Sequence, residues 1–172
     1  MSKIFVAADY HFGHSNIIKY CNRPYKDVDE MDKALIKNHT SVVSNNDKIF
    51  ILGDFAFKNK NSISEIVKQL NGRKTLIMGN HDGYSYRYYL DAGFDEVYSC
   101  PIIYKNFFVM SHEPIFMNNN VPFANIYGHV HDNSEFKDYT EQSFCASMER
   151  INYTPIEFDV IVEKMKSCTK EN

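Results

Sequence analysis

The chain has 172 residues, of which 44% are hydrophobic and 24% charged, a balance typical of a globular protein that builds its own core. Its net charge of -3 argues against the basic surface that long duplex nucleic acid needs, although a local basic patch around a small phosphate stays open. The apolar run at the N-terminus is too short for a signal peptide, and no stretch approaches the length of a membrane-spanning helix. The length, without an internal linker or repeat, leads us to expect a single domain over residues 1–172.

The first half of the chain alternates short apolar runs with helical patterns. The apolar runs predict buried strands at residues 3–8, 48–52 and 74–78. The segments between them predict helices at residues 29–43 and 62–70, the first with an acidic first turn and the second with a serine cap. This alternation implies right-handed crossovers and a sheet that starts largely parallel.

The second half has a different character. Strands are predicted at residues 98–104 and 107–111, on either side of a hairpin turn at Lys105-Asn106. Later strands are predicted at residues 125–127, 143–148 and 156–158, followed by a final helix at 159–166. We therefore expect a sheet-on-sheet core flanked by helices, parallel early and antiparallel late.

Every histidine except His39 lies in a short polar cluster at the C-terminal end of a predicted strand. In chain order the clusters are Asp9-Tyr10-His11 with His14 beyond, Gly53-Asp54, Gly79-Asn80-His81-Asp82, Ser111-His112, and Gly128-His129-Val130-His131. Carboxylate oxygens and imidazole nitrogens are ligands for Mn²⁺, Fe²⁺ and Zn²⁺, and this edge of an α/β sheet is where ligand sites form. Since the donors are far apart in sequence, the fold must bring them together.

Taken alone, each cluster is more often an ordinary turn or core feature. Asp9 and His11 would share a face if the chain continued as a regular strand, and so would His129 and His131. Gly79-Asn80-His81-Asp82 is more specific, because a plain turn does not need the histidine. The clusters in this order, all at strand ends, predict a metal site.

This ordered pattern of DxH, GD, GNH[DE], a lone H and GHxH resembles the calcineurin-like metallophosphoesterase superfamily. The stretch from Ala8 to Ile18, with Asn22-Arg23-Pro24 after it, is similar to a small bacterial and phage branch. The resemblance covers most of the chain and implies an α/β/β/α sandwich, with two mixed sheets flanked by helices. It also implies a cytoplasmic location, in a bacterium or in the host cell of a phage.

The resemblance implies two divalent ions, with manganese favoured and iron, zinc or nickel as alternatives. The resemblance assigns to the first ion a donor set of Asp9, His11 and His131. It assigns to the second ion a donor set of Asn80, His112 and His129, and Asp54 would bridge the two ions. In such sites the ions lie about 3.5–4 Å apart and activate a water molecule for attack on phosphorus.

The resemblance also implies roles for residues around these ligands. His81 is expected to stabilise the transition state or to protonate the leaving alkoxide, and Asp82 to orient His81 by accepting its ring N–H. Asn80 is expected to contact the substrate as well as the metal.

Other polar residues have two readings. His14 would either donate to the substrate phosphate or cap the segment 15–20, and Arg23 would be either a phosphate-binding fork or a solvated turn. We expect His39 to be structural. Phe55-Ala56-Phe57 predicts an apolar pocket wall after Asp54, and one of Tyr84, Tyr86, Tyr88 and Tyr89 would line the same pocket.

These inferences predict a metal-dependent phosphoesterase. A phosphodiesterase on small nucleotides or cyclic nucleotides is favoured, with phosphomonoesterase as the alternative. No extended duplex nucleic acid and no membrane is expected as a partner. A non-catalytic interaction scaffold of the same fold stays open, although it has no need for His81. A nuclease of a DNA repair complex is disfavoured because such relatives carry added domains. The sequence does not determine the oligomeric state.

Overall fold

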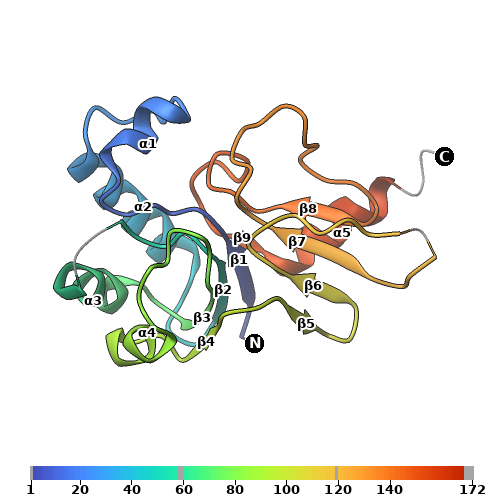
Figure 1. Ribbon diagram of the computed structural model, residues 1–172, viewed down its shortest axis with the longest axis horizontal. Helices are drawn as coiled ribbons and strands as arrows, with labels where there is room; N and C mark the ends of the chain where they lie inside the picture. The colour runs from blue at the N-terminus through green and yellow to red at the C-terminus, as the bar shows by residue number, and fades with distance from the viewer. Residues whose placement is uncertain (1, 58–59, 119, 169–172) are drawn as a thin grey trace.

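The computed structural model describes residues 2–57, 60–118 and 120–168, and it contains two mixed β-sheets flanked by helices (Figure 1). The five-stranded sheet has the order β4-β3-β2-β1-β9, and the four-stranded sheet has the order β5-β6-β7-β8. This is the α/β sandwich that the sequence resemblance implied.

The five-stranded sheet is built mainly from the first half of the chain. Its parallel strands are β1 (Ile4–Ala7), β2 (Lys48–Leu52), β3 (Arg73–Ile77) and β4 (Glu96–Tyr98), and β9 (Ile156–Glu157) joins antiparallel to β1. The first three strands match the predicted positions within a few residues. Their apolar side chains are largely buried, which is why short continuous hydrophobic runs identified them.

Helices connect these strands and cover the sheet on the left of Figure 1. They are α2 (Val28–Val42), α3 (Lys60–Gln69) and α4 (Tyr86–Ala92), with a short α1 (Ser15–Tyr20) before them. Asp27 caps α2 by accepting a hydrogen bond from the backbone of Glu30 at 2.9 Å.

The sequence analysis predicted α2 and α3 but neither α1 nor α4. The tyrosine-rich sequence of α4 has no clear helical period, and its ends are set by a Ser85 cap and by Gly93 in the left-handed region.

The second sheet corrects two predictions. It consists of β5 (Ile102–Tyr104), β6 (Phe108–Met110), β7 (Ala124–Tyr127) and β8 (Ser143–Cys145). The single strand predicted at 98–104 is in fact the end of β4 and the whole of β5, in different sheets, with Pro101 in the break between them. The late strands are also not antiparallel throughout, because β6, β7 and β8 run parallel, whereas β5 is antiparallel to β6 and β9 is antiparallel to β1 of the other sheet.

The predicted hairpin is confirmed. Lys105 and Asn106 join β5 to β6 with φ angles of 51° and 56°, as a tight hairpin turn requires.

The last helix, α5 (Phe158–Cys168), ties the two sheets together. It contacts β1 and β9 of one sheet and β8 of the other, and it buries Phe158, Ile161 and Met165. Within the described ranges, every helix is too short or too polar to serve as a membrane span.

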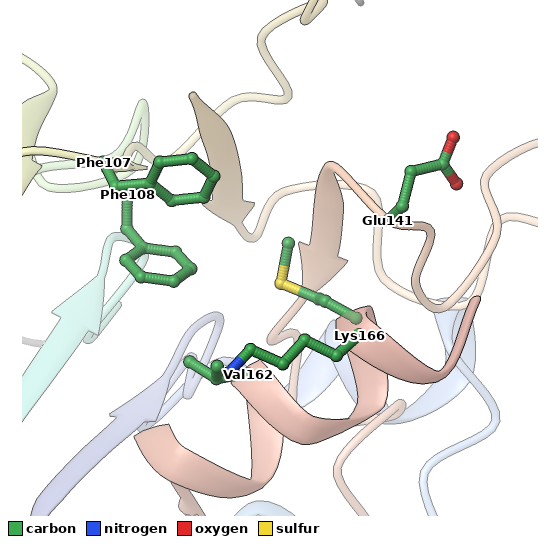
Figure 2. Close-up of a pocket in the computed structure, with 6 residues that line it drawn as sticks. Phe107, Phe108, Glu141, Val162 and Lys166 are labelled. Carbon is green, nitrogen blue, oxygen red and sulfur yellow. The ribbon is translucent and has the colours of Figure 1, made fainter. Parts of the chain in front are cut away.

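A small hollow of about 150 Å³ lies between α5 and the start of β6 (Figure 2). Phe107 and Phe108 form one side, and Val162, Met165 and Lys166 of α5 form the other. Because Phe107 precedes β6 and Phe108 begins it, whereas His112 follows its end, this hollow is at the opposite end of the strand from the polar clusters.

Candidate metal centre

The predicted donors lie in loops that leave the C-terminal ends of β1, β2, β3, β6 and β7, as the sequence analysis expected. The loops of the five-stranded sheet carry Asp9, His11, Asp54 and Asn80, and those of the four-stranded sheet carry His112, His129 and His131. The two sheets therefore contribute to one polar centre.

The first predicted donor set is compact, with Asp9 and His11 buried and His131 partly buried. One ligand atom from each of Asp9, His11 and His131 lies within 4.8 Å of the others. Oδ1 of Asp9 and Nε2 of His11 are buried without a hydrogen-bond partner. A buried polar atom without a partner is costly, so a cation at this position fits these residues.

Burial has opposite effects on these two groups. It raises the pKa of Asp9, against the opposing effects of His131 and His112, and it lowers the pKa of His11 to about 2. The imidazole of His11 therefore stays neutral, and its lone pair remains available to a metal ion.

The second donor set is equally close. Nε2 of His112 lies 2.9 Å from Oδ1 of Asn80 and 3.1 Å from Nδ1 of His129. The carbonyl of Leu52 accepts a hydrogen bond from Nδ1 of His112 at 2.9 Å, so in the neutral ring Nε2 carries the free lone pair. Acceptor atoms that converge in this way fit a cation between them.

Asp54 lies between the two sets. Its Oδ2 is 3.4 Å from Nε2 of His11, and its Oδ1 is 3.5 Å from Nε2 of His112. The backbone N–H of His81 donates to Oδ1 at 2.9 Å and fixes the carboxylate. Asp54 can therefore reach a cation in either set, which is the geometry expected of a bridging ligand.

The paired donors do not follow strand alternation, which corrects one step of the sequence argument. Asp9 and His11 have φ angles of 59° and 52°, and His129 and His131 have φ angles of 71° and 48°. All four residues lie in the left-handed region, where non-glycine residues are uncommon and often functional. The backbone therefore turns sharply at these strand ends instead of continuing as a strand. The side chains of both residues in each pair still lie at the polar centre.

His81 is exposed beside the donors. Its ring centroid lies 5.5 Å from that of His11, 5.9 Å from that of Phe57 and 6.3 Å from that of His14. This position allows it to contact a substrate.

Asp82 has a different role from the one expected. Its carboxylate accepts hydrogen bonds from the backbone N–H groups of Gly79 at 2.8 Å, Asp54 at 2.9 Å and Phe55 at 3.1 Å, rather than from the His81 ring. Burial raises its pKa to about 6, against the effect of these donors. Asp82 therefore joins the loops after β2 and β3. Among the described residues, the expected contact between its carboxylate and the His81 ring is absent, and the His81 ring instead lies beside other aromatic rings.

Arg23 fits neither of the two readings proposed for it, because it is neither a substrate-binding fork nor part of a solvated turn. It is only 3% exposed, and its guanidinium donates to the carbonyls of Asp9 at 2.7 Å and Tyr10 at 2.8 Å. It further donates to the carboxylate of Glu149 at 2.8 Å. Because the guanidinium lies beneath the loop after β1, it does not reach the surface where a substrate lies.

Of the two roles considered for His14, the structure does not support capping by its side chain. It is the N-terminal cap residue of α1, but its side chain makes no capping hydrogen bond. Its ring stacks on Phe57, with centroids 4.7 Å apart, and its Nδ1 lies 3.4 Å from Nδ1 of His11. The imidazole is thus beside the donor centre, within reach of a ligand there.

A cavity of about 430 Å³ opens onto the centre. Donor residues form part of its lining, and Ile17, Tyr20 and Phe57 form an apolar part. The predicted apolar wall is therefore confirmed at Phe57, whereas Phe55 belongs to the core. The tyrosine that lines the cavity is Tyr20, not one of the tyrosines after Asp82.

His39 is structural, as expected. It is fully buried in α2, where its Nδ1 is 2.8 Å from the hydroxyl of Tyr10 and its Nε2 is 2.9 Å from the carbonyl of Asn71. Tyr10 lies between the donors Asp9 and His11, so this contact anchors their loop to the helix.

Glu149 was missed by sequence reasoning. Its Oε2 accepts a hydrogen bond from Nδ1 of His131 at 3.1 Å, although it lies in the loop after β8 and in no recognisable motif. A glutamate outside any motif and followed by Arg150 does not indicate a functional site, because adjacent charged residues are usually exposed to solvent.

The sequence is similar to a known family and to known proteins. A model of the calcineurin-like phosphoesterase family matches residues 2–162. An uncharacterized protein of Methanocaldococcus jannaschii is 37% identical over 171 residues, which cover 95% of this chain and 91% of that protein. The Gene 66 protein of Mycobacterium phage L5 is 38% identical over 86 residues, covering 48% of this chain and 41% of that protein.

Solved structures share the fold. A protein of unknown function from Aquifex aeolicus has a TM-score of 0.72 and 30% identity, covering 95% of this chain and 100% of that one. A Pseudomonas putida nuclease has a TM-score of 0.52 at 21% identity, covering 74% of this chain and 61% of that one, a likeness in fold alone. The chain belongs to the calcineurin-like phosphoesterase family, whose members are dinuclear-metal-dependent phosphoesterases.

Proposed function

We propose that the protein hydrolyses phosphodiester bonds in small nucleotide-type or cyclic nucleotide substrates, in the cytoplasm and with Mn²⁺ as the preferred ion. The observation that carries this proposal is the convergence of acceptor atoms without donors, above all Oδ1 of Asp9 and Nε2 of His11, beside an open cavity. A cation would satisfy such a set, and the family supplies the reaction class.

The donor sets would hold two ions, with Asp54 between them. One would bind Asp9, His11 and His131, and the other Asn80, His112 and His129. Bound ions of this kind lower the pKa of water and neutralise the charge on phosphoryl oxygens.

The chain itself supplies the group that faces the leaving oxygen. His81 is exposed at the cavity, and its backbone is fixed by the hydrogen bond from its N–H to Asp54. An imidazole in this position donates a proton to the departing alkoxide, which typically contributes about 10²–10⁴-fold to a rate. The ring of Phe57 lies edge-on to that of His81, with the ring centroids 5.9 Å apart.

The aromatic wall supports a nucleotide-type substrate. Tyr20 is 71% exposed and Phe57 is 55% exposed, and both line the same cavity as the donors. A flat nucleobase would cover these rings while its phosphate lies at the donors, and base–aromatic stacking contributes about 1–3 kcal/mol per base. A bare alkyl phosphate would leave the rings uncovered.

Two alternatives remain. A phosphomonoesterase would use the same donors, and Nδ1 of His14 near His11 would favour it by offering a further donor to a dianionic phosphate. A non-catalytic scaffold of the same fold has no use for the exposed His81, which makes it the weaker alternative.

The test compares hydrolysis of bis-aryl and mono-aryl phosphates with Mn²⁺, followed by a nucleotide panel with Mn²⁺, Fe²⁺, Zn²⁺ and Mg²⁺. We expect preference for the diester. His81→Ala should retain both ions by metal analysis and lose about 10²–10⁴-fold in kcat.

A strong preference for the monoester would assign phosphomonoesterase activity instead. Full metal content without turnover on any ester would favour the scaffold. Loss of both ions in His81→Ala would overturn the role given to that residue.

A further inference from the structure

A buried ion pair lies directly behind the first donor set. Oε1 of Glu149 accepts hydrogen bonds from Arg23 at 2.9 Å to Nε and 2.8 Å to Nη2. The Arg23 side chain is fully buried and that of Glu149 is 5% exposed. Burying an ion pair costs desolvation free energy unless further hydrogen bonds satisfy both groups. The other hydrogen-bond partners of Arg23 and Glu149 therefore indicate the role of the pair.

Those other partners are the donor loops. Nη2 and Nη1 of Arg23 donate to the carbonyls of Asp9 at 2.7 Å and Tyr10 at 2.8 Å, in the left-handed turn after β1. Oε2 of Glu149 accepts from Nδ1 of His131, in the loop after β7. One guanidinium–carboxylate pair thus links two loops that come from different sheets.

We propose that Arg23 and Glu149 are positioning residues that hold Asp9, His11 and His131 in register for the first metal ion. Glu149 acts on His131 directly. Arg23 acts on Asp9 and His11 through the backbone of their loop. The proposal concerns metal binding and does not depend on which ester the protein hydrolyses.

The chemistry of each contact supports this assignment. A carboxylate that accepts the Nδ1 proton of His131 fixes the ring orientation and leaves Nε2 as the lone pair for a cation. The planar guanidinium satisfies two carbonyls and a carboxylate at once, which a lysine ammonium on its single atom does not reproduce.

The same residues could instead hold a further cation. One atom from each of Cys21, His131 and Glu149 lies within 4.8 Å of the others, a spacing that metal ions accept. The guanidinium of Arg23 already donates to Glu149 at 2.8 Å, and this fixed positive charge disfavours a cation beside it. We therefore assign the cluster to positioning.

The experiment is a calorimetric titration of Mn²⁺ into the metal-free full chain, read together with Mn²⁺ electron paramagnetic resonance. Wild type should bind two ions. Glu149→Gln should weaken one of them by about 10–100-fold and leave the affinity for the other unchanged. Arg23→Lys, which keeps the charge, should weaken the same ion.

Glu157→Gln is the matched control. It removes a glutamate–lysine pair, Lys3 with Glu157 at 2.8 Å, that lies at β9. Both affinities should remain at the wild-type value in this variant. Circular dichroism of each variant establishes that it is folded, and if Glu149→Gln does not fold, Arg23→Lys provides the test.

Equal weakening of both ions, or no change, would overturn the proposal, because a general loss of structure does not select one ion. A third ion bound by wild type and lost in Cys21→Ser would also overturn it and assign the cluster as a metal site. A wild-type chain that binds no Mn²⁺ at all would contradict it as well.

Discussion

At the scale of single residues, the candidate metal centre is supported by side chains that are not among the proposed ligands. Tyr10 separates Asp9 from His11 and is fully buried, with its ring stacked on Phe12 at a centroid distance of 5.1 Å. Its hydroxyl donates to His39, whose opposite nitrogen donates to the carbonyl of Asn71. This arrangement uses the neutral imidazole, in which one nitrogen donates and the other accepts.

The neutral state of His39 gives the protein a pH-dependent stability. Burial lowers the pKa of His39 to about 4, with a smaller contribution from the charge of Lys74 and against the hydrogen bond to Asn71. Since the unfolded chain binds this proton near pH 6.5, stability is complete above that pH and falls as the pH drops towards 4. At pH 5 the loss from this residue is about 2 kcal/mol.

His39→Gln tests this, because the glutamine amide can still donate to Asn71 and accept from Tyr10 without titrating. Urea unfolding of the metal-free protein at pH 7.5 and pH 5 should show that wild type loses about 2 kcal/mol more than the variant. Other histidines contribute equally to both proteins and cancel in the comparison. An identical pH dependence would contradict the assignment.

At the scale of elements, the loops after β2 and β3 pack against each other at a glycine. A Cβ atom at Gly79 would lie 2.7 Å from the backbone nitrogen of Asp54 and 2.9 Å from Cε1 of His112, and it would also meet Oδ1 of Asp54. At Gly83, a few residues further along the same loop, a Cβ atom has no neighbour within 4 Å. The packing of the two loops therefore requires a glycine at position 79 but not at position 83.

Gly79→Ala should therefore displace Asp54 or His112, whereas Gly83→Ala should not. Overpacking of this kind costs about 1–3 kcal/mol, and because Asp54 lies between the donor sets, both Mn²⁺ affinities should fall. Gly83→Ala should stay within about 0.5 kcal/mol of wild type and bind metal normally. Urea unfolding and calorimetry measure both effects, and a normal Gly79→Ala would show that the loops are not tightly packed.

The elements also show what the sequence could and could not predict. Strand ends and donor clusters were predictable, because buried parallel strands are continuous apolar runs and the motifs follow them directly. The left-handed turns at Asp9 and His131 were not, since nothing in a DxH or HxH spacing distinguishes a strand from a coil. Arg23 was misassigned for a related reason, because burial of a guanidinium depends on Glu149, 126 residues away.

At the scale of the whole molecule, the candidate metal centre draws its residues from loops that follow strands of both sheets, and Figure 1 shows these two sheets side by side. Asp9, His11, Asp54 and Asn80 follow strands of one sheet, and the remaining histidine donors follow strands of the other. Each predicted ion has ligands from both sheets. Ion binding is therefore coupled to the packing of one sheet on the other, in addition to the link that α5 provides.

This coupling predicts a large effect of metal on thermal stability. Ions that bind only the folded chain stabilise it by about 2.7 kcal/mol per site when free Mn²⁺ is a hundredfold above its Kd. For a chain of this size that corresponds to a rise in Tm of about 5–10 °C for each occupied site. Differential scanning calorimetry with EDTA and then with excess Mn²⁺ measures it.

Asp54→Ala is the decisive comparison, because it removes the residue between the two sets without altering either sheet. In EDTA its Tm should be at or above the wild-type value, since a buried carboxylate without a cation is unfavourable. With Mn²⁺ its Tm should rise much less than that of wild type, because both ions lose a ligand. If Mn²⁺ raises the Tm of the two proteins equally, Asp54 does not bridge, and the ions do not join the sheets through it.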